Sequence, residues 1–325
     1  MKLHVLSVGQ ADAMILELPS GRLAVVDCGH PALLDYLAAL DPTRHRRIAF
    51  CLLTHAHHDH YAHLEEFIAQ YDARVDEYWF SFVQPGAVSA LRALFTAAFR
   101  RRRGGSKARL LVQDLPAAQP FLLEEQVQLT RFCPSTQELY APVRADHTAE
   151  NNRSVVLLLR YGQCTVLLGA DAEEARWQRI AAQAGRAALP LAADVIKAPH
   201  HGAAAPHGMP ADLWPAVCRT PSTFVAFSVG AQGESWPGRG TITALHGQAT
   251  VRCTGRAAIC RPLGPAPAAV KGRARPTSLI ARSLTPPPET QAAPPCFGTQ
   301  VYTFDPCGSI TLTTSAHPAF LDACR

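Results

Sequence analysis

Short apolar runs separated by turn residues fill the first half of the chain and predict β-strands. These runs are Leu3–Val8, Ala13–Leu18, Leu23–Asp27 and Ile48–Thr54. Between and after them lie segments whose apolar residues recur at helical spacing. Their approximate bounds are Ala32–Leu40, Tyr61–Tyr71 and Ser89–Arg103. The alternation predicts a layered fold in which helices pack on strands.

The second half of the chain repeats this arrangement. Its strand-like runs are Val127–Phe132, Ser154–Tyr161, Cys164–Leu168 and Asp194–Lys197, and its clearest helix is Ala172–Ala184. Because strands followed by helices recur in both halves, we expect two sheets with helices outside them. Residues 261–295 are rich in Pro, Ala, Arg and Ser, which is typical of a surface loop or a disordered insertion. Strand-like alternation resumes at Val301–Thr313, so we expect one domain over residues 1–325.

Composition narrows the class of protein. With 325 residues and 48% hydrophobic content, the chain has enough apolar material for a sizeable core. It has no stretch of about 18 apolar residues and no signal-peptide pattern at its start, so we expect a cytoplasmic protein without a membrane span. The ten cysteines should then be mostly reduced thiols. The net charge of +5 permits a polyanionic substrate without requiring one.

The densest chemical signal is a histidine cluster directly after the run Ile48–Thr54. It reads His55-Ala56-His57-His58-Asp59-His60. Neutral imidazole and carboxylate are common ligands of Zn²⁺ and similar metals. His55 and His57 stand two apart at a strand end, so both can point to the same side. Asp59 and His60 fall at the start of the next helix and can serve a second ion, which favours a two-metal site over a disordered histidine-rich tract.

Two more strand-like runs end in metal-binding residue types. Val166–Leu168 leads to Asp171, and Ala193–Lys197 leads to His200-His201-Gly202. Asp171 taken alone would more often be a helix cap. With three strand ends offering ligands, we instead expect its carboxylate to bridge two ions, which stand about 3.5–4 Å apart in such sites.

The spacing His55-x-His57-x-Asp59-His60, followed by Asp171 and the 200–201 pair, resembles the metallo-β-lactamase superfamily. More narrowly, it resembles the hydrolase domain of ComEC-type DNA-uptake proteins and their free-standing soluble relatives. Further matching segments are Val8–Ala13, Asp27–Gly29, Asn151–Leu157, Ser228–Gly230 and Gly308–Leu312. The resemblance covers residues 1–230 and resumes near 301–313. It implies a four-layer αββα sandwich with metal ions at one sheet edge.

The resemblance also implies two ligand sets that share one carboxylate. They are His55, His57 and Asp171 around one ion, and Asp59, His60, Asp171 and His201 around the other. His201 is favoured over its neighbour, and His200 would then face the substrate as an acid or a hydrogen-bond donor. Asp59 would also orient the nucleophile. We expect Asp12 and Asp27 to be buried turn residues, and the two divalent ions to be zinc or manganese.

The chain departs from the relatives at several positions. Many members of the superfamily place a further histidine on the first ion, whereas this chain shows Asn151-Asn152 at the corresponding place. Asn152 is expected near the metal or the substrate, with a structural turn role as the open alternative. Three dipeptides or tripeptides also differ from the usual pattern: Tyr61-Ala62-His63, Gly169-Ala170 and Trp236-Pro237. Because every ligand is intact, metal binding is expected, while the substrate pocket is less defined.

Hydroxide held by two metals at neutral pH would make the protein a hydrolase. A phosphodiester, a thioester, a β-lactam and another ester are all candidate substrates. The resemblance and the run Arg100, Arg101, Arg102 and Arg103 favour a phosphodiester in nucleic acid or nucleotides, because arginine clusters pair well with phosphates. A solvated charged face at a helix end is the alternative for that run.

A function of another class stays open. The chain could be a regulatory or scaffolding subunit of a larger assembly, such as a defence or mobile-element system, and nothing in the sequence identifies a protein partner. The complete ligand set argues against this alternative, because sequence drift would remove ligands first.

Cysteines near the Pro-rich segment give a weaker signal. Cys253, Cys260, Cys296 and Cys307 could form a structural tetrahedral zinc site that closes the insertion. Their spacing is not the C-x₂-C of a zinc ribbon, so independent thiols are the favoured interpretation.

Overall fold

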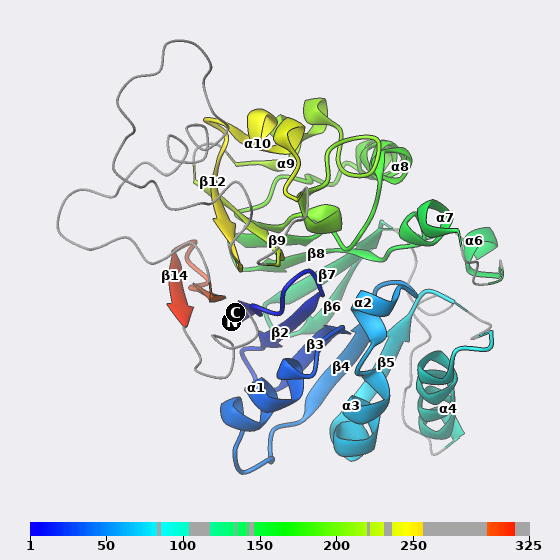
Figure 1. Cartoon of the computed structure of the whole chain (residues 1–325). Helices are drawn as coiled ribbons and strands as arrows, with labels where there is room; N and C mark the ends of the chain where they lie inside the picture. Colours follow the sequence, from blue (N-terminus) through cyan, green and yellow to red (C-terminus); the bar gives the residue numbers. More distant parts are fainter. Residues whose placement is uncertain are drawn as a thin grey trace, which may run out of the picture.

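Two mixed sheets of seven strands each form the centre of the molecule (Figure 1). The computed structural model describes residues 1–82, 86–103, 118–132, 134, 136–140, 142, 146–219, 222–230, 236–255 and 298–315. In spatial order the first sheet contains β14 (Ile310–Ser315), β13 (Thr299–Phe304), β1 (Lys2–Val5), β2 (Ala13–Glu17), β3 (Leu23–Cys28), β4 (Ile48–Leu53) and β5 (Val75–Phe80). The second contains β12 (Ala249–Cys253), β11 (Thr223–Phe227), β10 (Val195–Lys197), β9 (Cys164–Leu168), β8 (Val156–Tyr161), β7 (Val127–Phe132) and β6 (Pro120–Glu124).

Parallel pairing is confined to one part of each sheet. Strands β3, β4 and β5 run parallel in the first sheet, and β9 to β12 run parallel in the second. The remaining strand pairs are antiparallel. The carboxyl ends of parallel strands meet at one edge of a sheet, so each sheet has an edge where the loops after several strands lie together.

Helices cover the outer face of each sheet (Figure 1). Those on the first sheet are α1 (Ala32–Leu40), α3 (Leu64–Tyr71) and α4 (Ser89–Arg103). Those on the second are α8 (Glu174–Arg186), α9 (Trp214–Val217) and α10 (Arg239–Leu245). Shorter helices are α2 (His58–Tyr61), α6 (Thr136–Tyr140) and α7 (His147–Asn151). The expected four-layer αββα sandwich is therefore confirmed.

Three apolar clusters correspond to the three interfaces between these layers. The middle cluster joins the sheets through side chains such as Phe50 and Trp79, whose rings stack with centroids 3.9 Å apart. A second cluster packs α1, α3 and α4 on the first sheet, and a third packs α8, α9 and α10 on the second. Strands β3, β4 and β9 are buried along their whole length because both of their faces are covered, which explains their continuous apolar sequences.

The expected helix Tyr61–Tyr71 is interrupted in the structure. Residues 58–61 form α2, and α3 begins at Leu64. The backbone N–H of His63 donates to the carbonyl of Cys28 at 2.9 Å, so it does not continue the preceding helical turn. This bond ties the segment after the histidine cluster to the end of β3.

Some sequence predictions fall on residues outside the described part of the chain. The segment 261–295 lies there, and so do Cys260 and Cys296. Cys253 is buried at the end of β12, and Cys307 is exposed in the turn between β13 and β14. In the described residues, no helix has both the length and the apolar character needed to cross a membrane.

Candidate metal centre

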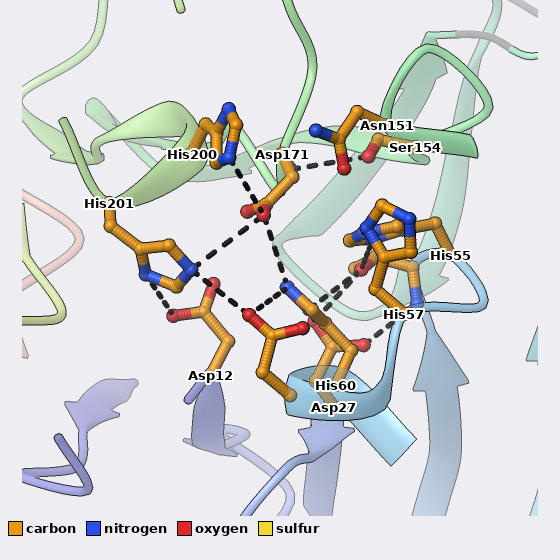
Figure 2. Close-up of polar contacts among 12 residues, drawn as sticks. Asp12, Asp27, His55, His57, His60, Asn151, Ser154, Asp171, His200 and His201 are labelled. Atoms are coloured by element: carbon orange, nitrogen blue, oxygen red, sulfur yellow. Dashed lines mark hydrogen bonds and ion pairs between the residues drawn. The ribbon is translucent and has the colours of Figure 1, made fainter. Parts of the chain in front are cut away.

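The loops after β4, β9 and β10 bring the predicted ligands to one place between the two sheets (Figure 2). Four of these residues place one ligand atom each within 4.8 Å of all the others: Asp59, His60, Asp171 and His201. Asp59 and His60 come from the first sheet's side, while Asp171 and His201 come from the second. The site is therefore assembled from both halves of the chain.

Asp171 occupies the middle of this group. Its Oδ2 atom lies 3.4 Å from His60 Nε2, 3.6 Å from His201 Nε2 and 4.0 Å from His200 Nε2. Figure 2 shows the three imidazoles arranged around this carboxylate. The position is the one that a carboxylate bridging two ions would need.

Three buried atoms of this group lack a hydrogen-bond partner in the described part of the chain. They are His60 Nε2, His201 Nε2 and Asp171 Oδ1. A buried polar atom without a partner costs about 1–3 kcal/mol, so such atoms need a ligand or an ion that compensates them. Two imidazole nitrogens and a carboxylate oxygen are donors that Zn²⁺ and Mn²⁺ accept. The residues present fit a divalent cation.

The tautomers of two histidines are consistent with metal binding. His60 Nδ1 lies 2.8 Å from Asp27 Oδ2, and His201 Nδ1 lies 3.1 Å from the carbonyl of Ser228. A carbonyl only accepts, so the proton of His201 resides on Nδ1 and the lone pair of Nε2 faces the centre of the site. Asp27 also accepts from the backbone and hydroxyl of Thr54, both at 2.8 Å, which fixes it as a buried support for His60.

His55 and His57 form a second, adjacent part of the site. His55 Nε2 and His57 Nδ1 lie 3.1 Å apart. Glu150 accepts from the backbone N–H of Ala56 at 3.0 Å and thereby holds the loop between them. The ring of His147, at the start of α7, lies 4.8 Å from the ring of His57. A further histidine, which the sequence does not single out, therefore lies beside His57.

Burial and neighbouring charges lower the pKa of some groups in the site and raise the pKa of others. Burial is the largest influence on His55 and lowers its pKa well below the ordinary value, which keeps the imidazole neutral. Burial also opposes the charge on His60, but Asp171 and Asp27 outweigh it and raise the pKa of His60 well above the ordinary value. For Asp171, burial is outweighed by His60 and His201, which hold its pKa well below the ordinary value. The carboxylate is therefore ionised and available to a cation.

The backbone around the histidine pair has an unusual conformation. His200 and His201 have φ values of 45° and 53°, and Gly202 follows at 88°. Left-handed non-glycine residues cost free energy and occur most often at functional sites. A Cβ atom on Gly202 would lie 2.4 Å from the ring of Phe227, so this turn requires glycine. The turn sends His201 into the site, and His200 Nδ1 lies 2.5 Å from the carbonyl of His207.

Asp12 is a buried turn residue, as the sequence predicts, and its partner is Lys197. Asp12 Oδ2 accepts from Lys197 Nζ at 2.8 Å, and both side chains are 0% exposed. Burial opposes ionisation of Asp12, but Lys197 outweighs it and holds the pKa of that carboxyl below its ordinary value. Sequence reasoning did not single out Lys197. A charged residue within an apolar strand ending at the histidine pair is the signal that could have found it.

The residues predicted to bind substrate are not brought together. Asn152 donates to the carbonyl of Thr148 at 2.9 Å and lines a cavity of about 340 Å³ together with Glu173 and His207. The hydrogen bond to Thr148 fits a structural turn role for Asn152, which is the alternative to a role near the metal or the substrate. Arg100 is exposed near the end of α4, and the side chains of residues 101–103 lie outside the described part of the structure.

Gly29 should be essential to the position of Asp59. A Cβ atom at residue 29 would lie 1.7 Å from the backbone oxygen of Asp59. Gly29→Ala must therefore displace the loop that carries this ligand. We expect a loss of about 1–3 kcal/mol in the free energy of unfolding, which is typical of overpacking, together with weaker metal binding. Urea denaturation and competition with a chelator measure the two effects.

Gly185→Ala in α8 is the matched control, because a Cβ atom there meets nothing within 4 Å. Alanine at this helical position should raise stability by about 0.5–1 kcal/mol and leave metal binding unchanged. Wild-type metal affinity in Gly29→Ala would show that this close approach does not position Asp59.

A family model matches the first part of the chain. Residues 6–84 match the model of the metallo-β-lactamase superfamily. The match covers β2, β3 and β4 with the whole histidine cluster, so the family model and the sandwich fold both support that superfamily. The narrower resemblance to ComEC-type proteins is not confirmed. No curated protein matches the chain.

The chain is also similar to several solved structures. The metallo-β-lactamase fold protein YhfI from Bacillus subtilis is 12% identical, with a TM-score of 0.47 over 77% of this chain and 95% of that one. Igni18, a metallo hydrolase from the archaeon Ignicoccus hospitalis, is 12% identical, with a TM-score of 0.44 over 78% of this chain and 95% of that one. The short form of human tRNase Z is 16% identical, with a TM-score of 0.38 over 69% and 91%. These similarities are too distant to transfer an activity.

Proposed function

We propose that the protein is a hydrolase that uses two divalent metal ions, zinc or manganese, to cleave phosphodiester bonds in nucleic acid or nucleotides. The observation that carries the proposal is the group of Asp59, His60, Asp171 and His201, whose ligand atoms lie within 4.8 Å of one another. Within the described part of the chain, this group includes three buried atoms without a hydrogen-bond partner. The superfamily match to the histidine cluster supports the same conclusion.

The residues of the site would have different roles. His55 and His57 would hold one ion, and Asp59, His60 and His201 would hold the other. Asp171 would contact both ions. When bound, the ions would supply a nucleophile at neutral pH and polarise the bond to be cleaved. Asp59 is 40% exposed at the side chain, so it can also accept a hydrogen bond from attacking water and orient it.

His200 is the candidate general acid. Its Nδ1 faces the carbonyl of His207, so the proton of the neutral ring resides on Nδ1. Nε2 points towards Asp171 and would carry a proton only in the charged ring. Its side chain is 19% exposed and lies at the rim of the site, where it could give a proton to a departing oxygen.

Hydrolysis of bis-p-nitrophenyl phosphate with added Mn²⁺ or Zn²⁺ tests this proposal. A thioester and a β-lactam should be assayed beside it, because non-phosphate esters are the second candidate. Thioester and lactam hydrolases of the superfamily that the chain resembles usually carry a further histidine on the first ion, and His147 lies next to His57. Turnover of the phosphodiester alone supports the proposal. Turnover of the thioester or the lactam alone would support hydrolysis of non-phosphate esters, the second candidate. A metal-loaded protein that turns over none of these substrates would favour a scaffolding role.

The arginine run should matter for long substrates and not for small ones. Changing Arg100, Arg101, Arg102 and Arg103 to Ser is expected to weaken nucleic-acid binding, because each contact between an arginine and a phosphate releases counterions. Each lost contact should reduce the log–log salt slope by about 0.7–0.9. Binding measured at several salt concentrations gives this slope. Hydrolysis of the small phosphodiester should stay unchanged.

Arg160→Ser and Arg186→Ser are suitable controls, since both side chains are exposed on the second sheet's side of the molecule. An unchanged salt slope in the fourfold variant would mean that the run is a solvated helix end.

A further inference from the structure

The buried pair of Asp12 and Lys197 lies directly behind the proposed metal centre. Asp12 belongs to the loop between β1 and β2, while Lys197 is the last residue of β10, so the pair joins the two sheets. Burying two charges is costly unless they pair closely, and such pairs often add little net stability. The location of this pair beside metal-binding residues therefore calls for a reason other than stability.

Asp12 lies next to two of the candidate ligands, Asp59 and His201. Its backbone N–H donates to the backbone oxygen of Asp59 at 3.1 Å. Its Oδ1 atom lies 3.8 Å from His201 Nδ1 and has no hydrogen-bond partner among the residues that the structure describes. Figure 2 shows the Asp12 carboxylate next to the edge of the His201 ring that faces away from Asp171. One residue thus faces the two ligands that come from opposite sheets.

We infer that Asp12 and Lys197 are positioning residues that set the affinity of the ion held by Asp59, His60, Asp171 and His201. The carbonyl of Ser228 accepts from His201 Nδ1 at 3.1 Å, and the negative charge of Asp12 at 3.8 Å further favours the proton on Nδ1, which leaves Nε2 as the ligand atom. Lys197 keeps Asp12 in place, and its Nζ also donates to the carbonyl of Ala198 at 3.2 Å, just before the turn that carries His201. A carboxylate behind a ligating histidine typically changes metal affinity by about 10–100-fold. This inference rests on the proposed function of the site as a metal centre.

The pair is expected to act on one ion and not on the other. His55 and His57 are held through Thr54 and Glu150 and make no contact with Asp12 among the interactions of the described residues. The ion that they bind should therefore be insensitive to the pair. Such a selective effect separates positioning from a general loss of structure.

The test replaces both charges together, as Asp12→Leu/Lys197→Met, so that no single buried charge remains. The affinity for Mn²⁺ and Zn²⁺ is measured by competition with a chromogenic chelator, and thermal melts followed by circular dichroism verify folding. We expect one ion to bind about 10–100-fold more weakly and the other to bind as in the wild type. In a His55→Ala/His57→Ala background, which should hold only the affected ion, the charge replacement should weaken the remaining ion by the same factor.

A second variant, Asp12→Asn/Lys197→Gln, keeps the shape of the pair and serves if the first does not fold. The matched control is Arg22→Met/Glu124→Leu, which removes an ion pair of 2.9 Å that also joins the two sheets away from the ligands. It should leave both affinities unchanged. Wild-type metal affinity in a folded Asp12 and Lys197 variant would overturn the inference. So would an equal loss of affinity for both ions, or an equal loss of affinity in the control variant.

These outcomes separate this inference from the proposed function. A wild-type protein that binds two ions but hydrolyses no ester would contradict the proposed function, while the affinity measurements would still decide the role of the pair.

Discussion

Replacing Asp171 by Ala is expected to abolish hydrolysis of a small phosphodiester. Its carboxylate lies beside the histidines of one proposed ligand set, with Oδ2 3.4 Å from His60 Nε2 and 3.6 Å from His201 Nε2. Loss of a residue that only supports a ligand typically costs about 10–100-fold in activity or affinity. Loss of a carboxylate that contacts both ions should exceed that range. Initial rates at saturating Mn²⁺ measure the effect.

Asp171→Asn is the companion variant, because it keeps the shape of the side chain and removes its charge. Asp212→Ala, at an exposed position outside the site, controls for the loss of a carboxylate as such. If folded Asp171→Ala or Asp171→Asn retains activity within about 100-fold of the wild type, Asp171 is a supporting residue and not the bridge.

Purified protein reconstituted with metal should contain two ions per chain. His55→Ala/His57→Ala should reduce the content to one ion, whereas Asp171→Ala should disturb both. Because the ions bind only the folded state, they should also raise its stability, by about 2.7 kcal/mol per site when free metal is 100 times Kd. Elemental analysis gives the stoichiometry, and thermal melts with and without a chelator give the stabilisation.

Fewer than one ion per chain after reconstitution would contradict the two-metal proposal. A chelator that leaves the melting temperature of the reconstituted protein unchanged would contradict binding of the ions to the folded state. His45→Ala, at an exposed position before β4, is the control for loss of a histidine outside the centre.

The metal centre could be predicted because its signals are local. His55, His57 and His60 follow an apolar strand within six residues, and Asp171 and His201 follow two more strands. Since loops after parallel strands lie at one edge, the sequence alone predicts that these residues meet. The choice of His201 as ligand came from the family resemblance, and the geometry now favours it, because His201 and not His200 belongs to the group within 4.8 Å.

The supports of the site could not be predicted because they depend on distant contacts. Lys197 and Asp12 are separated by 185 positions, and no periodicity relates them. His147 belongs to no motif in the sequence. Its position next to His57 becomes visible only when the fold places α7 beside the histidine cluster. Strand β5 was missed for a different reason: Asp76 and Glu77 interrupt its apolar pattern, although three of its last residues are buried.

The assembly of one centre from two sheets makes metal affinity a property of the whole core. The free energy that binds the proposed ions would also hold the sheets together, so packing between the sheets and metal binding would be thermodynamically linked. A cavity at Phe50, in the apolar cluster that joins the sheets, would loosen the interface between them and raise the dissociation constant of the ions. Variation in the apolar core could thus tune the metal requirement of this protein without any change in its ligands.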